Sequence, residues 1–233
     1  MLPLPLFSGA LLASVHLYRS PSGASAEPWA RRHSGAFSTL DCLGFPPSGL
    51  WKESHYVAEI TSVASTLLTV WADSERQKQK QLVAFCCTQR IVDEDHLLSL
   101  VVHPSWRGHG LARVLVLASQ WAARAAGQRL LTLDVRASNE AAIHLYQSCG
   151  FRAVGRRPRY YKQPQEDALL LTAEFAENSL LLDTLVDAGP AEAACAIRGT
   201  ACSTPVVAGE NSAVPGSMTV ERYGEQLGEL VLM

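Results

Sequence analysis

The chain has 233 residues, 48% of them hydrophobic, which is enough for one domain with a sizeable core. Its formal charge of −2 combines 18 Lys/Arg against 14 Asp/Glu in residues 1–175 with 2 against 8 in residues 176–233. The mildly positive first part argues against a nucleic-acid track, which needs a denser basic stripe, and no run approaches the roughly 18 apolar residues of a membrane span.

The six cysteines show neither C-x-x-C spacing nor a partner cluster of histidines. This pattern predicts neither a zinc site nor a disulfide framework. We therefore expect a protein without a metal, in a reducing compartment.

Residues 1–26 contain five serines, a single arginine and no acidic residue. This composition is compatible with an organellar transit peptide, which would place the protein in a stroma or matrix. The alternative is that residues 15–18 form a first strand and residues 27–39 a first helix of the fold, in which case the expected location is cytoplasmic. Both interpretations stay open at this stage.

The next segments predict a short helix and three strands. A turn at residues 45–47 precedes an expected helix at 49–54. The segment 56–70 is rich in Val, Ile and Thr, and the segment 81–92 alternates enough to pair with it as a hairpin. The apolar run 96–103, which Pro104 ends, predicts a buried strand.

A glycine-rich turn follows this strand directly. Residues 106–113 read Trp-Arg-Gly-His-Gly-Leu-Ala-Arg, with Gly108 and Gly110 at the turn and an amphipathic helix after it. A tight turn that leaves a strand and opens a helix lets backbone N–H groups converge on a phosphate at the positive end of the helix. Because it lacks Lys-Ser/Thr and a third glycine, the turn is neither a triphosphate loop nor a dinucleotide loop.

The second half alternates strands and helices. The first helix is expected to end at Gly127, a strand to follow at 130–136, and Ser138 or Asn139 to cap a helix over 140–149 that Gly150 ends. Segments 151–161 and 166–175 predict two closing strands, so the order is typical of an α/β layer fold.

Past residue 175 the composition changes to Ala, Gly, Ser, Thr and Pro. Residues 180–186 and 218–232 have some helical potential, but little there can bury an apolar stripe. We expect a poorly ordered, acidic tail.

Four motifs in order resemble a known family. The pattern Arg107-x-x-Gly110-x-Ala112 is similar to the pyrophosphate loop of the GCN5-related N-acetyltransferases (GNAT family). Residues 133–151, 156–161 and 166–169 resemble the subgroup that acetylates the N-terminal alanine of ribosomal protein bS18, the RimI type. The resemblance covers about residues 37–175.

This resemblance implies the GNAT fold, a mixed central sheet with flanking helices and splayed strands 4 and 5. It also implies a division into an N-terminal extension (1–35), an acetyltransferase domain (36–175) and the tail (176–233).

Acetyl-CoA is the co-substrate that the resemblance implies. Backbone groups of the glycine turn would hold its pyrophosphate, the strand before the turn would pair with the pantetheine arm, and Asn139 would contact the arm. The expected cofactor-binding residues are Leu100, Val101, Val102, Arg107, Gly108, His109, Gly110, Leu111, Ala112, Arg113 and Asn139.

Two residues stand where the family has its catalytic groups. Asp134 occupies the position of a glutamate base; because it is one methylene shorter, relay through a water is expected, and the alternative is an ion pair with Arg136 or a neighbouring strand. Tyr146 stands at the position of the general acid, and the alternative is a packed aromatic side chain. The phenol suits a thiolate leaving group, since their ordinary pKa values are about 10 and 8.5.

Tyr160 and Tyr161 are expected to border the acceptor groove, either binding a peptide backbone or covering a sheet edge.

The predicted function is transfer of acetyl to the α-amine of a protein N-terminus, with the alanine of bS18 as the leading acceptor. The expected partner is a protein or peptide N-terminus, with no direct nucleic-acid or membrane partner. A lysine side chain or a small free amine as acceptor remains an alternative, and so does a silent acyl-CoA sensor.

Overall fold

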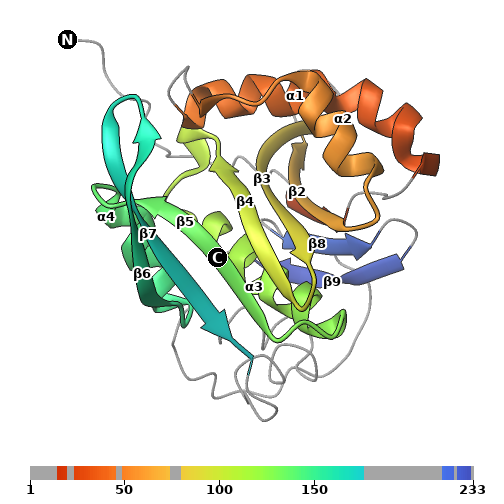
Figure 1. Cartoon of the computed structure of the whole chain (residues 1–233). Helices are drawn as coiled ribbons and strands as arrows, with labels where there is room; N and C mark the ends of the chain where they lie inside the picture. Colours follow the sequence, from red (N-terminus) through yellow and green to blue (C-terminus); the bar gives the residue numbers. More distant parts are fainter. Residues whose placement is uncertain are drawn as a thin grey trace.

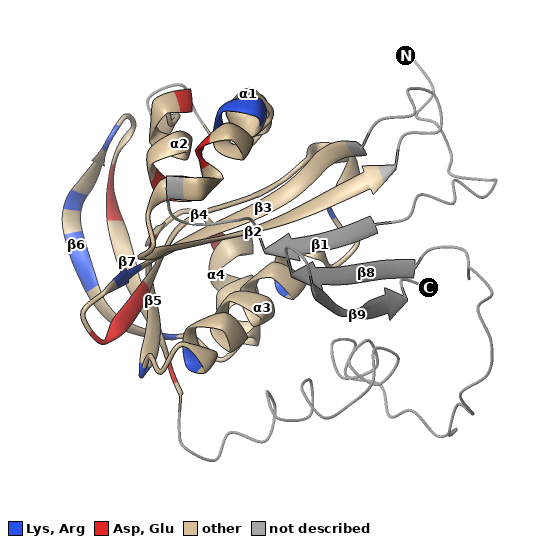
Figure 2. Ribbon diagram, turned by 90° about the vertical axis from the view of Figure 1, so that its right-hand side faces the viewer, with Lys and Arg blue, Asp and Glu red and all other residues tan. Residues whose placement is uncertain are grey.

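The protein folds around a mixed sheet with helices on both faces (Figure 1). The computed structural model describes residues 15–19, 24–45, 49–73, 80–175, 217–222 and 225–231. The strand order is β6-β7-β5-β4-β3-β2-β1-β8-β9. Helices α1 and α2 cover one face and α3 and α4 the other (Figures 1 and 2). This is the α/β arrangement expected from the sequence.

The N-terminal elements follow the sequence prediction in part. Strand β1 (Val15–Arg19) pairs antiparallel with β2, and after a short 3-10 turn, η1 (Ala24–Ala26), helix α1 (Glu27–Gly44) begins where predicted. Helix α2 is Glu53–Thr61, so the prediction of a helix at 49–54 followed directly by a strand was wrong. Tyr56 and Ile60, four residues apart, are both buried on one side of α2, and this helical spacing prevails over their strand propensity.

Three antiparallel strands form the middle of the sheet. They are β2 (Ser65–Asp73), β3 (Lys80–Ile91) and β4 (Glu94–Val102). The predicted hairpin of β2 and β3 and the predicted strand before the glycine turn are confirmed. None of the helices in the described ranges combines the length and the apolar run that crossing a bilayer needs.

The second half agrees closely with prediction. It consists of α3 (Leu111–Ala125), β5 (Leu130–Arg136), α4 (Glu140–Ser148), β6 (Arg152–Lys162) and β7 (Gln165–Glu174). Gly127 and Gly150 follow α3 and α4 with φ of +79° and +90°, a left-handed conformation that ends a helix and favours glycine.

The C-terminal strands differ from the prediction. Residues 218–232 were expected to be helical or poorly ordered, but β8 (Ser217–Arg222) pairs parallel with β1, and β9 (Glu225–Val231) pairs antiparallel with β8. The sequence Met-Thr-Val-Glu alternates apolar and polar residues, which is a strand period that the helical interpretation overlooked. The segment 180–186 lies outside the described residues.

Two hydrophobic cores lie on the two faces of the sheet. Phe37 of α1 and Tyr56 of α2 pack with Phe85 of β3 on one face, and Leu115 of α3 packs with Leu131 of β5 on the other. The neighbours Cys86 and Cys87 are both fully buried and belong to opposite cores, because consecutive strand residues point to opposite faces. The sheet therefore separates the α1–α2 layer from the α3–α4 layer.

Strands β4 and β5 part after a short contact. Their parallel pairing joins Glu94–His96 to residues 130–132 and does not continue in the described structure. In β4 the register against β3 shifts so that Leu98 is an extra residue, and such a bulge bends a strand and increases its twist. The expected splaying of the two central strands is confirmed, and it opens the sheet at the end where β4 leads into the glycine turn.

The aromatic core predicts a large effect for one substitution. Phe37 is fully buried, with ring centroids 5.4 Å from Tyr56 and 5.3 Å from Phe85. Phe37→Ala should lower the free energy of unfolding by about 3–5 kcal/mol in urea titration, because it removes apolar contacts and leaves a cavity. Val63→Ala, at a position that is 83% exposed, is the matched control and should change it little. A loss below about 1 kcal/mol for Phe37→Ala would contradict this packing.

Candidate active site

The glycine turn joins the splayed end of β4 to helix α3. A short 3-10 turn, η3 (Pro104–Trp106), follows β4, and then Gly108 and Gly110 take φ of +82° and +80°. Residues with a Cβ rarely adopt this conformation, so the turn requires glycine at both positions for its backbone path. The path brings the chain directly into α3 at Leu111.

The beginning of α3 presents unused backbone donors. The first intrahelical bond runs from the Val114 N–H to Gly110 O at 3.1 Å, so the N–H groups of Leu111, Ala112 and Arg113 precede the helical ladder. The first turn contains no acidic side chain to satisfy them. Donors of this kind at the positive end of a 15-residue helix form a site suited to an anion such as a diphosphate.

The basic side chains around the turn have specific partners. Arg107 Nε donates to Val102 O at 3.2 Å and Arg107 Nη2 to Leu43 O at 3.3 Å, while its own N–H lies 3.3 Å from Pro104 O. His109 Nδ1 lies 3.0 Å from Arg107 O, and Arg113 Nη1 donates to Ser148 Oγ at 3.1 Å. Arg107 thus lies at the predicted position, but its side chain contacts protein carbonyls.

Residues 100–102 form the last part of β4. Leu100, Val101 and Val102 pair with β3 on one side, opposite Cys86, Phe85 and Ala84. On the other side, the pairing with β5 has already ended at His96 within the described structure. In the described structure residues 100–102 therefore have no partner strand on the β5 side, although Val102 O accepts from Arg107 Nε.

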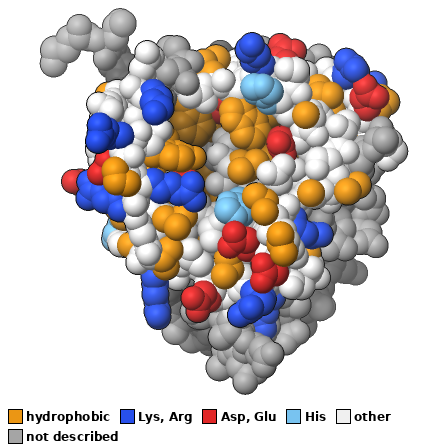
Figure 3. Space-filling view, in the orientation of Figure 1, with side chains coloured by type: hydrophobic (Ala, Val, Ile, Leu, Met, Phe, Trp, Pro, Cys, Tyr) orange, Lys and Arg blue, Asp and Glu red, His pale blue; other side chains and the backbone are white. Residues whose placement is uncertain are grey.

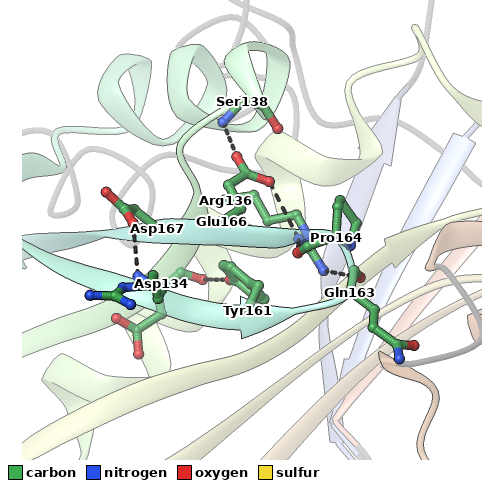
Figure 4. Close-up of polar contacts among 9 residues, drawn as sticks. Asp134, Arg136, Ser138, Tyr161, Gln163, Pro164, Glu166 and Asp167 are labelled. Atoms are coloured by element: carbon green, nitrogen blue, oxygen red, sulfur yellow. Dashed lines mark hydrogen bonds and ion pairs between the residues drawn. The ribbon is translucent and has the colours of Figure 1, made fainter.

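Asp134 lies on β5 and forms an ion pair. Its Oδ1 is 3.3 Å from Arg157 Nε of β6. Its backbone carbonyl accepts a hydrogen bond from Tyr161 Oη at 3.2 Å, as Figure 4 shows. An ion pair of Asp134 is therefore present, but its partner lies on β6, one strand beyond the neighbouring β7. Arg136, the other partner considered, pairs with Glu166 at 3.3 Å instead. Sequence reasoning did not single out Arg157, because nothing in a run of arginines indicates which one faces β5.

The tyrosine pair on β6 packs against this network. The rings of Tyr160 and Tyr161 are perpendicular with centroids 5.1 Å apart, and the Arg136 guanidinium lies 4.0 Å from the Tyr161 ring centre. Tyr160 is 45% exposed. Burial, followed by the nearby Asp134 carboxylate, raises the pKa of Tyr161 to about 12, so its hydroxyl remains a donor at neutral pH.

Tyr146 lies on the inner side of α4. It is buried in the α3–α4 core, 5.5 Å from the Phe151 ring, as the packing alternative anticipated. Burial is the main cause that raises the pKa of Tyr146 far above its ordinary value, with smaller contributions from the nearby cysteines and Tyr161. The phenol is therefore protonated at neutral pH, and its raised pKa makes it a weaker proton donor than a free phenol.

Asn139 caps helix α4. Its Oδ1 accepts from the Ala142 N–H at 3.2 Å, which confirms the predicted cap. Because the side-chain oxygen satisfies the helix, the exposed amide NH₂ is the group left for a ligand.

A hollow lies between the α1–α2 layer and the β6–β7 hairpin. Figure 3 shows it lined by hydrophobic side chains, with Lys and Arg side chains along the hairpin side. Large hydrophobic residues are exposed at the end of α1, at the bulge of β4 and on β6, namely Leu43, Phe45, Leu98 and Tyr160. Sequence reasoning missed the first three, since exposure of an apolar residue depends on packing that periodicity does not show.

Comparison with known proteins points to a family of acetyltransferases. Residues 36–151 match the model of the Acetyltransferase (GNAT) family. The [ribosomal protein bS18]-alanine N-acetyltransferases of Salmonella typhimurium and Haemophilus ducreyi are 40% and 35% identical over 95 and 97 residues, which are 39% and 40% of this chain and 63% and 67% of theirs. The match to the Salmonella relative thus spans slightly less than two thirds of that protein.

Solved structures share the fold. The ribosomal-protein alanine N-acetyltransferase of Escherichia coli superposes with a TM-score of 0.54 at 26% identity, covering 70% of this chain and 97% of that one. A putative acetyltransferase from Acinetobacter baylyi, 15% identical, reaches 0.57 and covers 70% of this chain and 94% of its own, a likeness of fold alone. With the family match, the identities above and the splayed sheet, the chain belongs to the GNAT family of acetyltransferases.

Proposed function

We propose that the protein transfers acetyl from acetyl-CoA to the α-amine of a protein N-terminus, with the alanine of ribosomal protein bS18 as the leading acceptor. The observation that carries this proposal is the turn at Gly108 and Gly110, which opens α3 beside the parted strands β4 and β5. The acceptor rests on the names of the bacterial relatives that the chain resembles.

The residues of the splayed end fit acetyl-CoA. The N–H groups between Gly108 and Arg113 would hold the diphosphate, and the free side of residues 100–102 would pair with the amide groups of the pantetheine arm. The Asn139 NH₂ would contact the same arm. This arrangement directs the acyl carbon into the opening between β4 and β5, where an amine can attack it.

The amine must be uncharged when it attacks. An α-amine has a pKa near 8, so its deprotonation near pH 7 is worth only about 1 kcal/mol and a weak base suffices. In our proposal Asp134 accepts this proton through a water, because its side chain is short and its Oδ1 already lies against Arg157. Tyr146 then protonates the departing thiolate.

A direct assay tests the reaction. Purified protein, acetyl-CoA and a peptide that begins Ala-Arg should release CoA, and mass spectrometry should locate the new acetyl group on the α-amine. Release with polyamines and none with the peptide would reject the acceptor. Binding of acetyl-CoA without release to any amine would indicate a sensor.

Removing the Tyr146 hydroxyl should slow the chemical step. We expect Tyr146→Phe to lower kcat by about 100-fold, within the range for loss of a general acid, with the affinity for acetyl-CoA changed little. The ring and its contact with Phe151 are retained, so the thermal unfolding midpoint serves as the control for folding. An unchanged kcat would show that Tyr146 is only a packed aromatic residue.

The role of Asp134 can be separated from its ion pair. Asp134→Asn should lower kcat by about 10–100-fold because the amide cannot accept a proton, whereas Asp134→Glu should retain most activity. Glu174→Gln, which removes an exposed carboxylate from neighbouring β7, is the control. Equal activity of the Asn variant and the wild type would remove the proposed base.

The pH dependence follows from the two proton transfers. The apparent kcat/KM should rise with pH and level off above about pH 8, because the acceptor amine must lose its proton. The acid must keep its proton, and the raised pKa of Tyr146 moves any alkaline decline to higher pH, so we expect none up to about pH 10. Initial rates in overlapping buffers measure this profile, and a decline with a midpoint near 9 would contradict the assignment.

A further inference from the structure

The Arg107 side chain joins two parts of the site that are far apart in sequence. It connects the glycine turn to the C-terminal end of α1, 64 residues earlier, through the 3.3 Å bond to Leu43 O. Its Nε holds the end of β4 through Val102 O. The guanidinium therefore connects the turn, the end of β4 at Val102 and the end of α1 at Leu43. This meeting point of Arg107, Val102 and Leu43 is the joint.

The C-terminal end of α1 needs such a cation. The last carbonyls of a helix lack intrahelical partners and carry the negative end of its dipole, and α1 has no basic residue in its own last turn. Arg107 supplies the missing donor to Leu43 O. This is a more specific role than attraction to a phosphate, because Nε, Nη2 and the backbone N–H of Arg107 each have a partner within the protein.

A second contact fixes the same joint from the opposite side. Gly44, the last residue of α1, lies so close to β4 that an added Cβ would be 2.8 Å from Val101 Cγ1. Val101 is buried and its branched side chain has little freedom to move. Glycine is therefore required here for the close approach of helix and strand.

The same end of α1 is also bonded to Trp51, which precedes α2. The buried Asp41 carboxylate accepts from the Trp51 N–H at 3.1 Å, so the chain that leaves α1 is tied back to it before α2 begins. Leu43 and Phe45, both exposed, stand at this end of α1. A shift of α1 relative to β4 would move all of these residues together.

We propose that Arg107 is a positioning residue that holds the acceptor side of the site, formed by the end of α1 and by Trp51, which is bonded to it, against the cofactor turn. This inference rests on the proposed function, because it takes the turn as the acetyl-CoA site and the neighbouring α1 end as the acceptor side. It predicts that loss of the Arg107 side chain impairs the use of the acceptor and leaves cofactor binding intact.

Two variants disturb the joint from its two sides. Arg107→Met keeps the apolar stem but removes the donors, and Gly44→Ala forces α1 away from Val101. Both should raise the KM for an Ala-Arg peptide by about tenfold, with the Kd for CoA, measured by calorimetry, changed by less than about twofold. Arg107→Lys can replace one of the two bonds and should be intermediate. Arg129→Met, which removes an exposed cation elsewhere, is the charge control.

Hydrogen exchange gives a readout that does not depend on activity. The amides of Phe45 and Trp51, which donate to Asp41 O and Asp41 Oδ2, should exchange several-fold faster in both variants. The amide of Ala126, at the far end of α3, should be unaffected.

The outcomes separate the two proposals. A CoA Kd that rises tenfold or more in Arg107→Met, with the peptide KM unchanged, would make Arg107 a phosphate ligand and overturn the inference. Unchanged exchange at Phe45 and Trp51 would overturn it as well. If the wild type neither bound CoA nor acetylated any peptide, the proposed function would fail, and the exchange rates would still decide whether Arg107 holds the joint.

Discussion

The parting of β4 and β5 is the constraint on which the rest of the site depends. Had the two strands continued to pair beyond His96, their backbone groups would satisfy one another and no extended ligand could enter. The bulge at Leu98 turns β4 away, and the glycine turn then begins α3 at the open end. In the described structure the end of β4 thus lacks a β5 partner, and the beginning of α3 places its first N–H groups beside it.

The chemistry proposed for this opening is modest. An α-amine near neutral pH needs little help to lose its proton, and a thiolate is a good leaving group. The two groups proposed for the proton transfers are an ion-paired aspartate and a buried phenol. Most of the expected rate acceleration would come from holding two substrates together, which depends on the stability of the opening between β4 and β5 and of the glycine turn.

Much of this fold could be predicted from periodicity and turn residues. Helix α3, strand β5 and helix α4 appear at their predicted positions because each has a clear apolar pattern and each of the two helices is followed by a glycine. Helix α2 was misassigned because Tyr56 and Val57 favour strands locally, and only burial against Phe37 and Phe85 selects the helix. The C-terminal hairpin was missed because its pairing with β1 joins segments about 200 residues apart, which local patterns do not show.

The site was predictable in its backbone and less so in its side chains. The turn at Gly108 and Gly110 follows from sequence, but the partners of Asp134 and Arg107 depend on which strand and helix lie beside them.

The most direct test of the account is calorimetric titration with CoA and with pantetheine, which lacks the diphosphate. The account predicts micromolar binding of CoA and at least about 100-fold weaker binding of pantetheine. Equal affinities, or no binding of CoA at millimolar concentration, would contradict it.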